Sequence, residues 1–272
     1  MKTIKLNNFE IGGNKLTILA GPCAMESKEI SLTTAKKLKE ICAKLDINFV
    51  FKTSFDKANR SSLTSYRGLG MEEGLEILSE IKNELNVPIV TDIHESWQAE
   101  PTAKVADIIQ IPAFLCRQTD LLIAAAKTGK IINIKKGQFL SPYQMKSIAQ
   151  KVVDSGNDKI IITDRGTSFG YNNLVVDMRG VQITQEELNY PYCFDATHSV
   201  QIPGGHGGSS AGERKFVPLL AKSAIAAGAK VLFFEIHPNP ENALCDGDNM
   251  LPLDECEKTL DICNKIFNLV NQ

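Results

Sequence analysis

Eight short apolar runs recur along this chain, and polar or charged residues follow each of them. The runs span residues 15–20, 48–53, 87–91, 107–111, 130–134, 159–163, 192–196 and 230–234. Parallel strands that helices cover on both faces are typically continuous apolar runs of this length. Stretches of helical periodicity separate them, near residues 27–45, 72–85, 96–104, 119–128, 142–154, 213–227 and 253–269. This alternation predicts an α/β fold, a (β/α)8 TIM barrel with its active site at the carboxyl ends of the strands.

The length of the chain favours one barrel without a second domain. Its 272 residues match a typical barrel of about 250 residues, and no linker-like segment divides them. We therefore expect residues 1–272 to form a single domain. Within residues 1–13, apolar Ile4, Leu6, Phe9 and Ile11 lie between turn residues, which predicts a short β-hairpin that could close the bottom of the barrel.

The composition argues against several classes of function. The net charge is -2, with acids and bases spread along the chain, which does not favour nucleic-acid binding. The longest apolar stretches are shorter than the roughly 20 residues of a membrane span. The N-terminus has no apolar signal core, and the seven cysteines form no CxxC pairs. We therefore expect a cytoplasmic protein with reduced thiols, without nucleic-acid or membrane partners.

Four candidate metal ligands follow strands that become neighbours when the barrel closes. Cys23 follows the first strand and His198 the seventh, while Glu235 ends the eighth and Asp246 lies in the next loop. One sulfur, one imidazole and two carboxylates suit a divalent ion such as Zn, Fe, Co or Mn. Each residue also has a plainer role: a buried small side chain, a general base or the partner of a lysine. Cys245 is the nearest rival thiol.

Cations gather at the ends of the second, fifth and sixth strands, and they would repel one another unless anions lay between them. Salt bridges to Asp56, Asp92 and Asp164 can account for only part of this set. Substrates with several negative charges explain the rest, because Arg and Lys both bind phosphate and carboxylate. The six cations are Lys52, Lys57, Arg60, Lys135, Lys136 and Arg165.

Two segments near these cations have features of binding loops. Asn59, Arg60, Ser61 and Ser62 suit phosphate binding, although either serine could also be a helix N-cap. Residues 199–212 contain five glycines and no apolar period, which predicts a mobile loop over the active site. The alternative is a disordered surface loop.

Several of these segments resemble the Kdo 8-phosphate synthases, also called 2-dehydro-3-deoxyphosphooctonate aldolases. The similarity runs from about residue 15 to 253. The most diagnostic segment is Lys-Ala-Asn-Arg-Ser-Ser at 57–62, where the sister heptulosonate 7-phosphate synthases have a Lys-Pro-Arg-Thr-Ser pattern. The other matching segments are 21–23, 51–56, 111–120, 135–139, 164–166, 169–171, 194–198 and 245–247.

The resemblance implies a condensation of phosphoenolpyruvate with D-arabinose 5-phosphate and water. Its products are 3-deoxy-D-manno-octulosonate 8-phosphate and inorganic phosphate, for lipopolysaccharide biosynthesis. Cys23 after Gly-Pro resembles the metal-dependent branch, with His198, Glu235 and Asp246 as the other ligands. A metal-dependent hydrolase, an erythrose 4-phosphate-dependent heptulosonate synthase and a non-catalytic phosphosugar- or metal-binding barrel are the alternatives.

The resemblance also implies roles for individual residues. Lys52, Lys57, Asp92 and His198 would be catalytic residues. Arg117 would reach the site from a neighbouring subunit of a homotetramer. The substrate-binding residues would be Lys57, Asn59, Arg60, Ser61, Gln110, Arg117, Lys135, Gln138 and Arg165.

Overall fold

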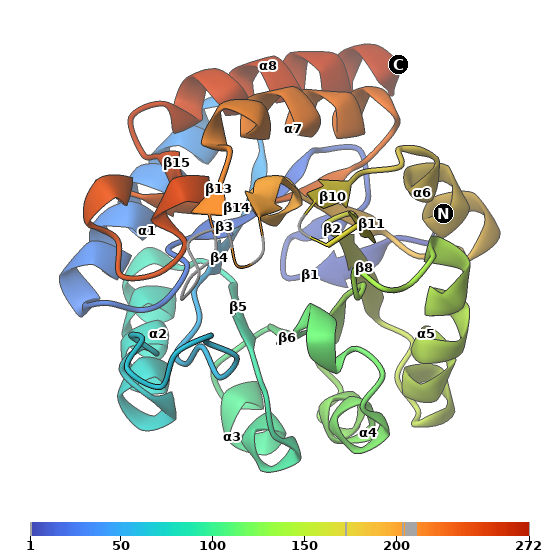
Figure 1. The fold of residues 1–272 in the computed structure, drawn as a ribbon, viewed down its shortest axis with the longest axis horizontal. Coiled ribbons are helices and arrows are strands. Elements are labelled where there is room, and N and C mark those ends of the chain that lie inside the picture. The colour runs from blue at the N-terminus through green and yellow to red at the C-terminus, as the bar shows by residue number, and fades with distance from the viewer. Residues whose placement is uncertain (1, 172, 203, 205–210, 272) are drawn as a thin grey trace.

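The barrel predicted from the apolar runs is confirmed by the computed structural model, which describes residues 2–171, 173–202, 204 and 211–271. β11 pairs with β14, and β14 pairs with β3, so the parallel sheet closes on itself (Figure 1). In the described part of the chain the eight barrel strands are β3 (Thr17–Gly21), β4 (Asn48–Lys52), β5 (Ile89–Asp92), β6 (Ile108–Ile111), β7 (Ile131–Lys135), β8 (Ile160–Asp164), β11 (Tyr192–Asp195) and β14 (Val231–His237).

Helices surround the strands, as Figure 1 shows. They are α1 (Lys28–Lys44), α2 (Met71–Leu85), α3 (Ala99–Ala103), α4 (Thr119–Lys127), α5 (Met145–Asp154), α6 (Arg179–Gln182), α7 (Val217–Ala226) and α8 (Cys256–Val270). Ser27 is the N-cap of α1, as predicted, because its side chain accepts a hydrogen bond from Ile30 N. Short 3-10 turns precede α3, α5 and α7, at Ser96–Gln98, Pro142–Gln144 and Arg214–Phe216. No helix among the described residues combines the length and apolar character that crossing a membrane requires.

Short antiparallel strand pairs and helical turns lie in the loops between the barrel strands. β9 (Thr167–Phe169) pairs with β10 (Asn173–Val175), and a π-helical turn at Ile183–Glu187 follows α6. β12 (Gln201–Ile202) pairs with β13 (Ala211–Gly212), and β15 (Leu251–Pro252) pairs in parallel with the end of β14. Other 3-10 turns span Ala113–Leu115, His198–Val200, Pro240–Asn242 and Gly247–Asn249. Half of the predicted mobile loop at 199–212, residues 203 and 205–210, lies outside the described residues.

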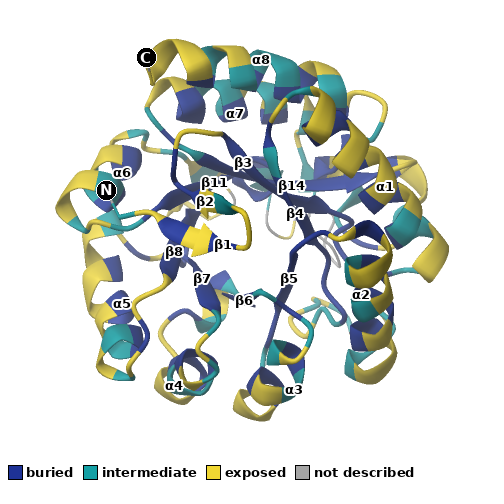
Figure 2. Cartoon of the chain, turned by 180° about the vertical axis from the view of Figure 1, so that it is seen from behind, coloured by how far each residue is buried: buried dark blue, intermediate teal, exposed yellow. Residues whose placement is uncertain are grey.

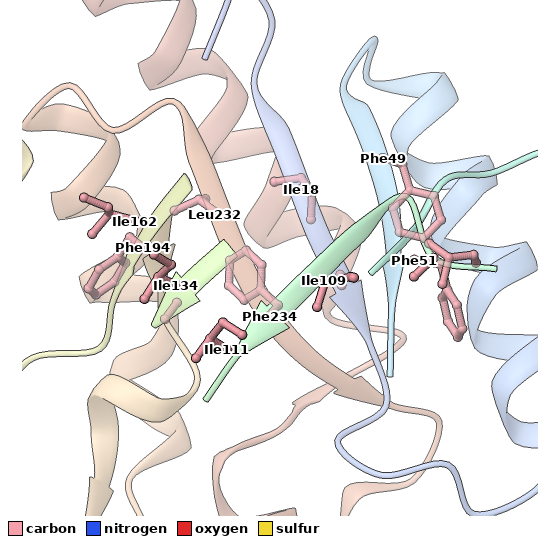
Figure 3. Close-up of a cluster of buried hydrophobic side chains, with 14 of the residues drawn as sticks. Ile18, Phe49, Phe51, Ile109, Ile111, Ile134, Ile162, Phe194, Leu232 and Phe234 are labelled. Atoms are coloured by element: carbon pink, nitrogen blue, oxygen red, sulfur yellow. The ribbon is translucent and has the colours of Figure 1, made fainter. Parts of the chain in front are cut away.

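Successive side chains of the strands pack on opposite faces of the barrel wall. One set packs outward against the helices and includes the isoleucines and phenylalanines labelled in Figure 3. The other set fills the barrel interior and includes Leu19, Val50 and Ile108. The strands are therefore buried, whereas the outer faces of the helices are exposed (Figure 2).

A hairpin of β1 (Ile4–Leu6) and β2 (Phe9–Ile11) covers the lower part of this interior. Its Ile4, Leu6 and Ile11 are buried in one cluster with residues of the barrel strands, such as Leu19 and Val231. This packing closes the amino ends of the strands, so the opposite end of the barrel is left for polar groups.

Candidate active site

The interior of the barrel changes from apolar to polar toward the carboxyl ends of its strands. In a strand every second residue shares a face, so positions 50 and 52 both point inward, as do 108 and 110, and 233 and 235. The first member of each pair is apolar and belongs to the interior cluster. The second is polar and buried. The inward polar residues of the upper layer are Lys52, Asp92, Gln110, Asn133, Lys135, Thr163, Asp195 and Glu235.

A cavity of about 220 Å³ opens above this polar layer. It brings together most of the predicted site residues: Lys52, Lys57, Asn59, Arg60, Ser61, Asp92, Gln110, Lys135, Gln138, Arg165, His198 and Asp246. Three predicted residues do not line it. Cys23 and Glu235 are completely buried behind its wall, and Arg117 is exposed on the loop after β6.

The turn that carries Cys23 lies close against the end of β4. A Cβ atom at Gly21 would lie 2.0 Å from Lys52 O, so only glycine permits this approach. Met25 N donates to Ser54 O at 2.9 Å, and Ser54 N donates to Cys23 O at 3.3 Å. These bonds hold the Cys23 thiol at the rim of the barrel.

The four predicted metal ligands converge around Asp246. Its Oδ2 lies 3.6 Å from Cys23 Sγ and 3.8 Å from His198 Nε2. His198 Nε2 lies 3.4 Å from Glu235 Oε2. Ligand atoms on one tetrahedral ion stand roughly 3.3–3.8 Å apart, given bonds of about 2.0–2.3 Å. These atoms form two triads that share Asp246, one with Cys23 and Cys245 and one with His198 and Glu235, and the atoms of each triad lie within 4.8 Å of one another. The donor types of both triads suit a divalent ion such as Zn.

Two further features of these side chains fit a cation. Glu235 is completely buried, and its Oε2 has no hydrogen-bond partner among the described residues. Although burial disfavours the charged carboxylate, His198 and Lys57 hold the pKa of Glu235 down to about 2. Burial and the neighbouring Cys245 raise the pKa of the Cys23 thiol well above its ordinary value, so metal binding there must displace a proton.

His198 is held by a carboxylate that the sequence analysis did not select. Asp195 Oδ1 accepts a hydrogen bond from His198 N at 3.0 Å, and its Oδ2 lies 2.8 Å from Nδ1 of the ring. Lys135 Nζ donates to the same Oδ2 at 2.7 Å. Because Nδ1 faces Asp195, Nε2 is turned toward Glu235 and Asp246, which is the usual arrangement of a metal-binding histidine.

The cations of the cavity differ in how far their charge is balanced. Lys52 lies 3.3 Å from Asp92, and Lys57 lies 3.4 Å from Glu235. Arg165 is buried and has no carboxylate within salt-bridge distance among the described residues. It donates only to His198 O and Gln201 Oε1, and its Nε has no partner in the same part of the chain. A buried cation of this kind requires an anion in the cavity.

Lys136 does not belong to the predicted group of anion-binding cations. Its neighbour Lys135 points into the barrel, so Lys136 lies on the opposite face. There Lys136 Nζ lies 3.3 Å from Asp164 and donates to the carbonyls of Leu140 and Gly166 at 3.1 Å. Lys136 therefore stabilises the loops after β7 and β8, and it is one of the cations that a salt bridge to Asp164 accounts for.

Residues that were not predicted as site residues lie in the cavity or directly beside it. Ser54 accepts from Lys52 Nζ at 2.6 Å and donates to Asp92 Oδ1 at 2.5 Å. His94 Nε2 lies 3.1 Å from Asp92 Oδ2. Asp195 could have been found by strand alternation, because it shares the inward face with Cys193. The remaining lining residues are His94, Pro112, Ala113, Phe114, Gln201 and Gly204. Pro112, Ala113 and Phe114 lie in the matching segment 111–120, and Gln201 and Gly204 lie in the segment predicted to cover the site.

Glu26 ties together the two loops that carry the thiol and Asp246. Its Oε1 accepts from Leu244 N at 2.9 Å, and its Oε2 lies 3.7 Å from His237 Nε2. Glu26→Ala should therefore weaken divalent-ion affinity about 10- to 100-fold, as loss of a residue supporting metal ligands does. Calorimetric titration of metal-free protein with Mn2+ measures this effect. Glu26→Gln can still accept the hydrogen bond from Leu244 N, so its affinity for Mn2+ should fall less. Equal affinities of the wild type and both variants would show that Glu26 does not support the metal site.

Comparison with known proteins places this barrel in a family. A model of the DAHP synthetase I family matches residues 3–272. A 2-dehydro-3-deoxyphosphooctonate aldolase from Fusobacterium nucleatum is 53% identical over 268 residues, which cover 98% of this chain and 96% of that protein. Proteins of the same name from Syntrophotalea carbinolica and Rickettsia prowazekii are 54% and 56% identical and are covered over 93% and 94% of their length. The predicted resemblance is confirmed, and the chain belongs to the DAHP synthetase I family, among its 2-dehydro-3-deoxyphosphooctonate aldolases.

Proposed function

We propose that this protein condenses phosphoenolpyruvate with D-arabinose 5-phosphate and water, and releases inorganic phosphate. The observation that carries the proposal is the buried, unpaired Arg165 in the same cavity as the Asn59–Arg60–Ser61 segment. Arg165 can bind the phosphate or carboxylate of phosphoenolpyruvate, and the Asn59–Arg60–Ser61 segment can bind the phosphate of the sugar. The name shared by the similar proteins supports the same reaction.

The cations at the carboxyl ends of the barrel strands suit phosphoenolpyruvate, because they line the cavity. We assign Lys57, Lys135 and Arg165 to its anionic groups, together with the amides of Gln110 and Gln138. The amide of Gln110 has a fixed neighbour: Thr163 Oγ1 donates to Asn133 Oδ1 at 2.5 Å, and Asn133 Nδ2 donates to Gln110 Oε1 at 3.4 Å. This chain leaves the NH2 group of Gln110 free to donate to an anion.

The reaction forms a bond between C3 of phosphoenolpyruvate and the aldehyde carbon, while water adds at C2. Lys52, Ser54 and Asp92 form a buried hydrogen-bonded chain beside this position that can hold or transfer a proton. Burial lowers the pKa of Lys52, although Asp92 opposes this effect, so its ammonium group is a better proton donor than an exposed lysine. Holding both substrates in register supplies a large part of the rate enhancement.

We further propose that the enzyme depends on a divalent metal held by Cys23, His198, Glu235 and Asp246. Such an ion supplies Lewis-acid polarisation beside the reacting groups. The supporting observations are the closeness of Asp246 to Cys23 in one group and to His198 and Glu235 in another, and the Oε2 of Glu235, which has no hydrogen-bond partner among the described residues. The mixture of sulfur, nitrogen and oxygen donors suits Zn, Fe, Co or Mn.

The proposed reaction is tested by measuring phosphate release from phosphoenolpyruvate with metal-loaded protein. We expect release with arabinose 5-phosphate, in equal amount to the eight-carbon product detected by mass spectrometry. Erythrose 4-phosphate serves as the control acceptor and should give little release. Release with erythrose 4-phosphate alone would identify a heptulosonate synthase, and no release with either sugar would refute the proposal.

Arg60→Ala should separate the two substrate sites. We expect the KM for arabinose 5-phosphate to rise at least about 30-fold, because a charge-assisted contact of about 2 kcal/mol is lost. The KM for phosphoenolpyruvate should change much less. Steady-state kinetics with each substrate varied in turn measures both values. An equal rise in both KM values would show that Arg60 does not belong to the sugar-phosphate site.

We also propose that the protein is a homotetramer in which Arg117 completes the site of a neighbouring subunit. Arg117 is exposed and does not line the cavity of its own chain. Phe114, on the same loop, is 58% exposed although it lines the cavity, and Phe139 is 57% exposed. Apolar side chains at this rim are typical of surfaces that another subunit covers. Sedimentation should give four times the 29.9 kDa of one chain, whereas a monomer that turns over at full rate would exclude the proposal.

A further inference from the structure

Cys245 brings a second thiol to the metal centre. Its Sγ lies 3.1 Å from Cys23 Sγ, and both side chains are buried. The ligand atoms of Cys23, Cys245 and Asp246 all lie within 4.8 Å of one another. Those of His198, Glu235 and Asp246 form another group within the same limit. Asp246 is common to both groups, so it can serve an ion on either side.

The spacing of the first group fits coordination by two thiolates and a carboxylate. Thiolates on one tetrahedral ion stand roughly 3.8 Å apart when each bond is about 2.3 Å. Cys23 Sγ and Cys245 Sγ reach this spacing by a small outward movement from 3.1 Å. The 3.6 Å between Cys23 Sγ and Asp246 Oδ2 already matches a sulfur–oxygen edge.

The surroundings of Cys245 are those of a ligand rather than only of a packing residue. Arg60 Nη1 donates to its Sγ at 2.7 Å, and N–H donors to sulfur are common beside metal-bound thiolates. Ala24 and Met250 pack in the same small apolar cluster, which would suffice for a buried hydrophobic cysteine. Simple packing, however, does not account for a sulfur that faces both a second sulfur and a guanidinium group.

We propose that the centre binds thiophilic divalent ions through Cys23, Cys245 and Asp246. Harder ions instead take Cys23 with His198, Glu235 and Asp246, because imidazole and carboxylate suit them better than a second thiolate. The softness of the ion therefore decides on which side of Asp246 it sits. This inference extends the metal centre of the proposed function, but it concerns ion binding and requires no turnover.

The test is a titration of metal-free protein with Cd2+, followed by the ultraviolet absorbance of sulfur-to-cadmium charge transfer. The double variant Cys23→Ala/Cys245→Ala gives the contribution of the other cysteines, which is subtracted. We expect the remaining absorbance of the wild type to be about twice that of Cys245→Ala, because two thiolates bind instead of one. Cys263→Ala, which removes a buried thiol in α8, is the matched control and should equal the wild type.

Binding of Mn2+ by the same proteins shows whether the variant centre is intact. Cys245→Ala and the isosteric Cys245→Ser should bind Mn2+ within about twofold of the wild type, since Mn2+ prefers oxygen and nitrogen ligands. Equal cadmium absorbance in the wild type and Cys245→Ala would overturn the proposal. Loss of Mn2+ binding in both Cys245 variants would also overturn it, because Cys245 would then support the whole centre. Neither result depends on whether the protein condenses the proposed substrates.

Discussion

Cys23→Ala is expected to lose bound metal and phosphate release together, while the barrel stays folded. The substitution removes the proposed sulfur ligand, which lies 3.6 Å from Asp246 Oδ2 and is completely buried. Loss of a residue that merely supports a metal ligand costs about 10- to 100-fold in affinity or activity. Loss of the ligand itself should therefore lower kcat by at least about a hundredfold on the same basis.

Metal analysis of the purified variant, its turnover and its far-ultraviolet circular dichroism measure these three properties. Cys263→Ala is the matched control, because it removes a buried thiol far along the chain in α8 and should keep both metal and activity. Cys23→Asn replaces the thiol by an uncharged amide, which cannot become a thiolate, so it should lose metal as well. Full activity of metal-free Cys23→Ala would contradict the role of the thiol.

Arg165→Ala is expected to have the second large effect, on phosphoenolpyruvate. The guanidinium group is buried, and no carboxylate among the described residues lies within salt-bridge distance of it, although Asp195, Asp246 and Glu235 favour its charge from farther away. Removing one partner of a buried charge pair weakens binding by about 2–5 kcal/mol. The kcat/KM for phosphoenolpyruvate should therefore fall at least about 30-fold, which corresponds to about 2 kcal/mol.

Arg179→Ala is the control for this substitution. Arg179 is 85% exposed and pairs with Asp177 on the surface, so its loss should leave the kinetics unchanged. Arg165→Lys keeps the charge but not the planar pair of donors, and should fall between the wild type and Arg165→Ala. A normal kcat/KM for phosphoenolpyruvate in Arg165→Ala would mean that the cavity binds its anions elsewhere.

The sequence was sufficient to predict the barrel, because its strands are buried on both faces and helices alternate with them. The ends of the strands were predicted less accurately than their positions along the chain. The eighth strand continues to His237, so Glu235 lies inside it rather than at its end. The β9–β10 hairpin was not predicted, because it is largely exposed and burial therefore left no apolar pattern in its sequence.

The candidate site could be predicted where its residues follow barrel strands. Closure of the barrel brings Cys23, His198 and Glu235 together although they are far apart in the chain. Strand alternation separates Lys136 from Lys135, because neighbouring positions of a strand point to opposite faces. The contacts of Glu26 could not be foreseen, because they depend on how two irregular loops meet.

The most direct test of a metal-dependent condensation is phosphate release with phosphoenolpyruvate and arabinose 5-phosphate before and after removal of metal. The protein is treated with a chelator, the chelator is removed, and Zn2+, Fe2+, Co2+ or Mn2+ is added back separately. We predict that the stripped protein is inactive and that at least one of these ions restores release. Undiminished release by protein that metal analysis shows to be free of metal would contradict the account.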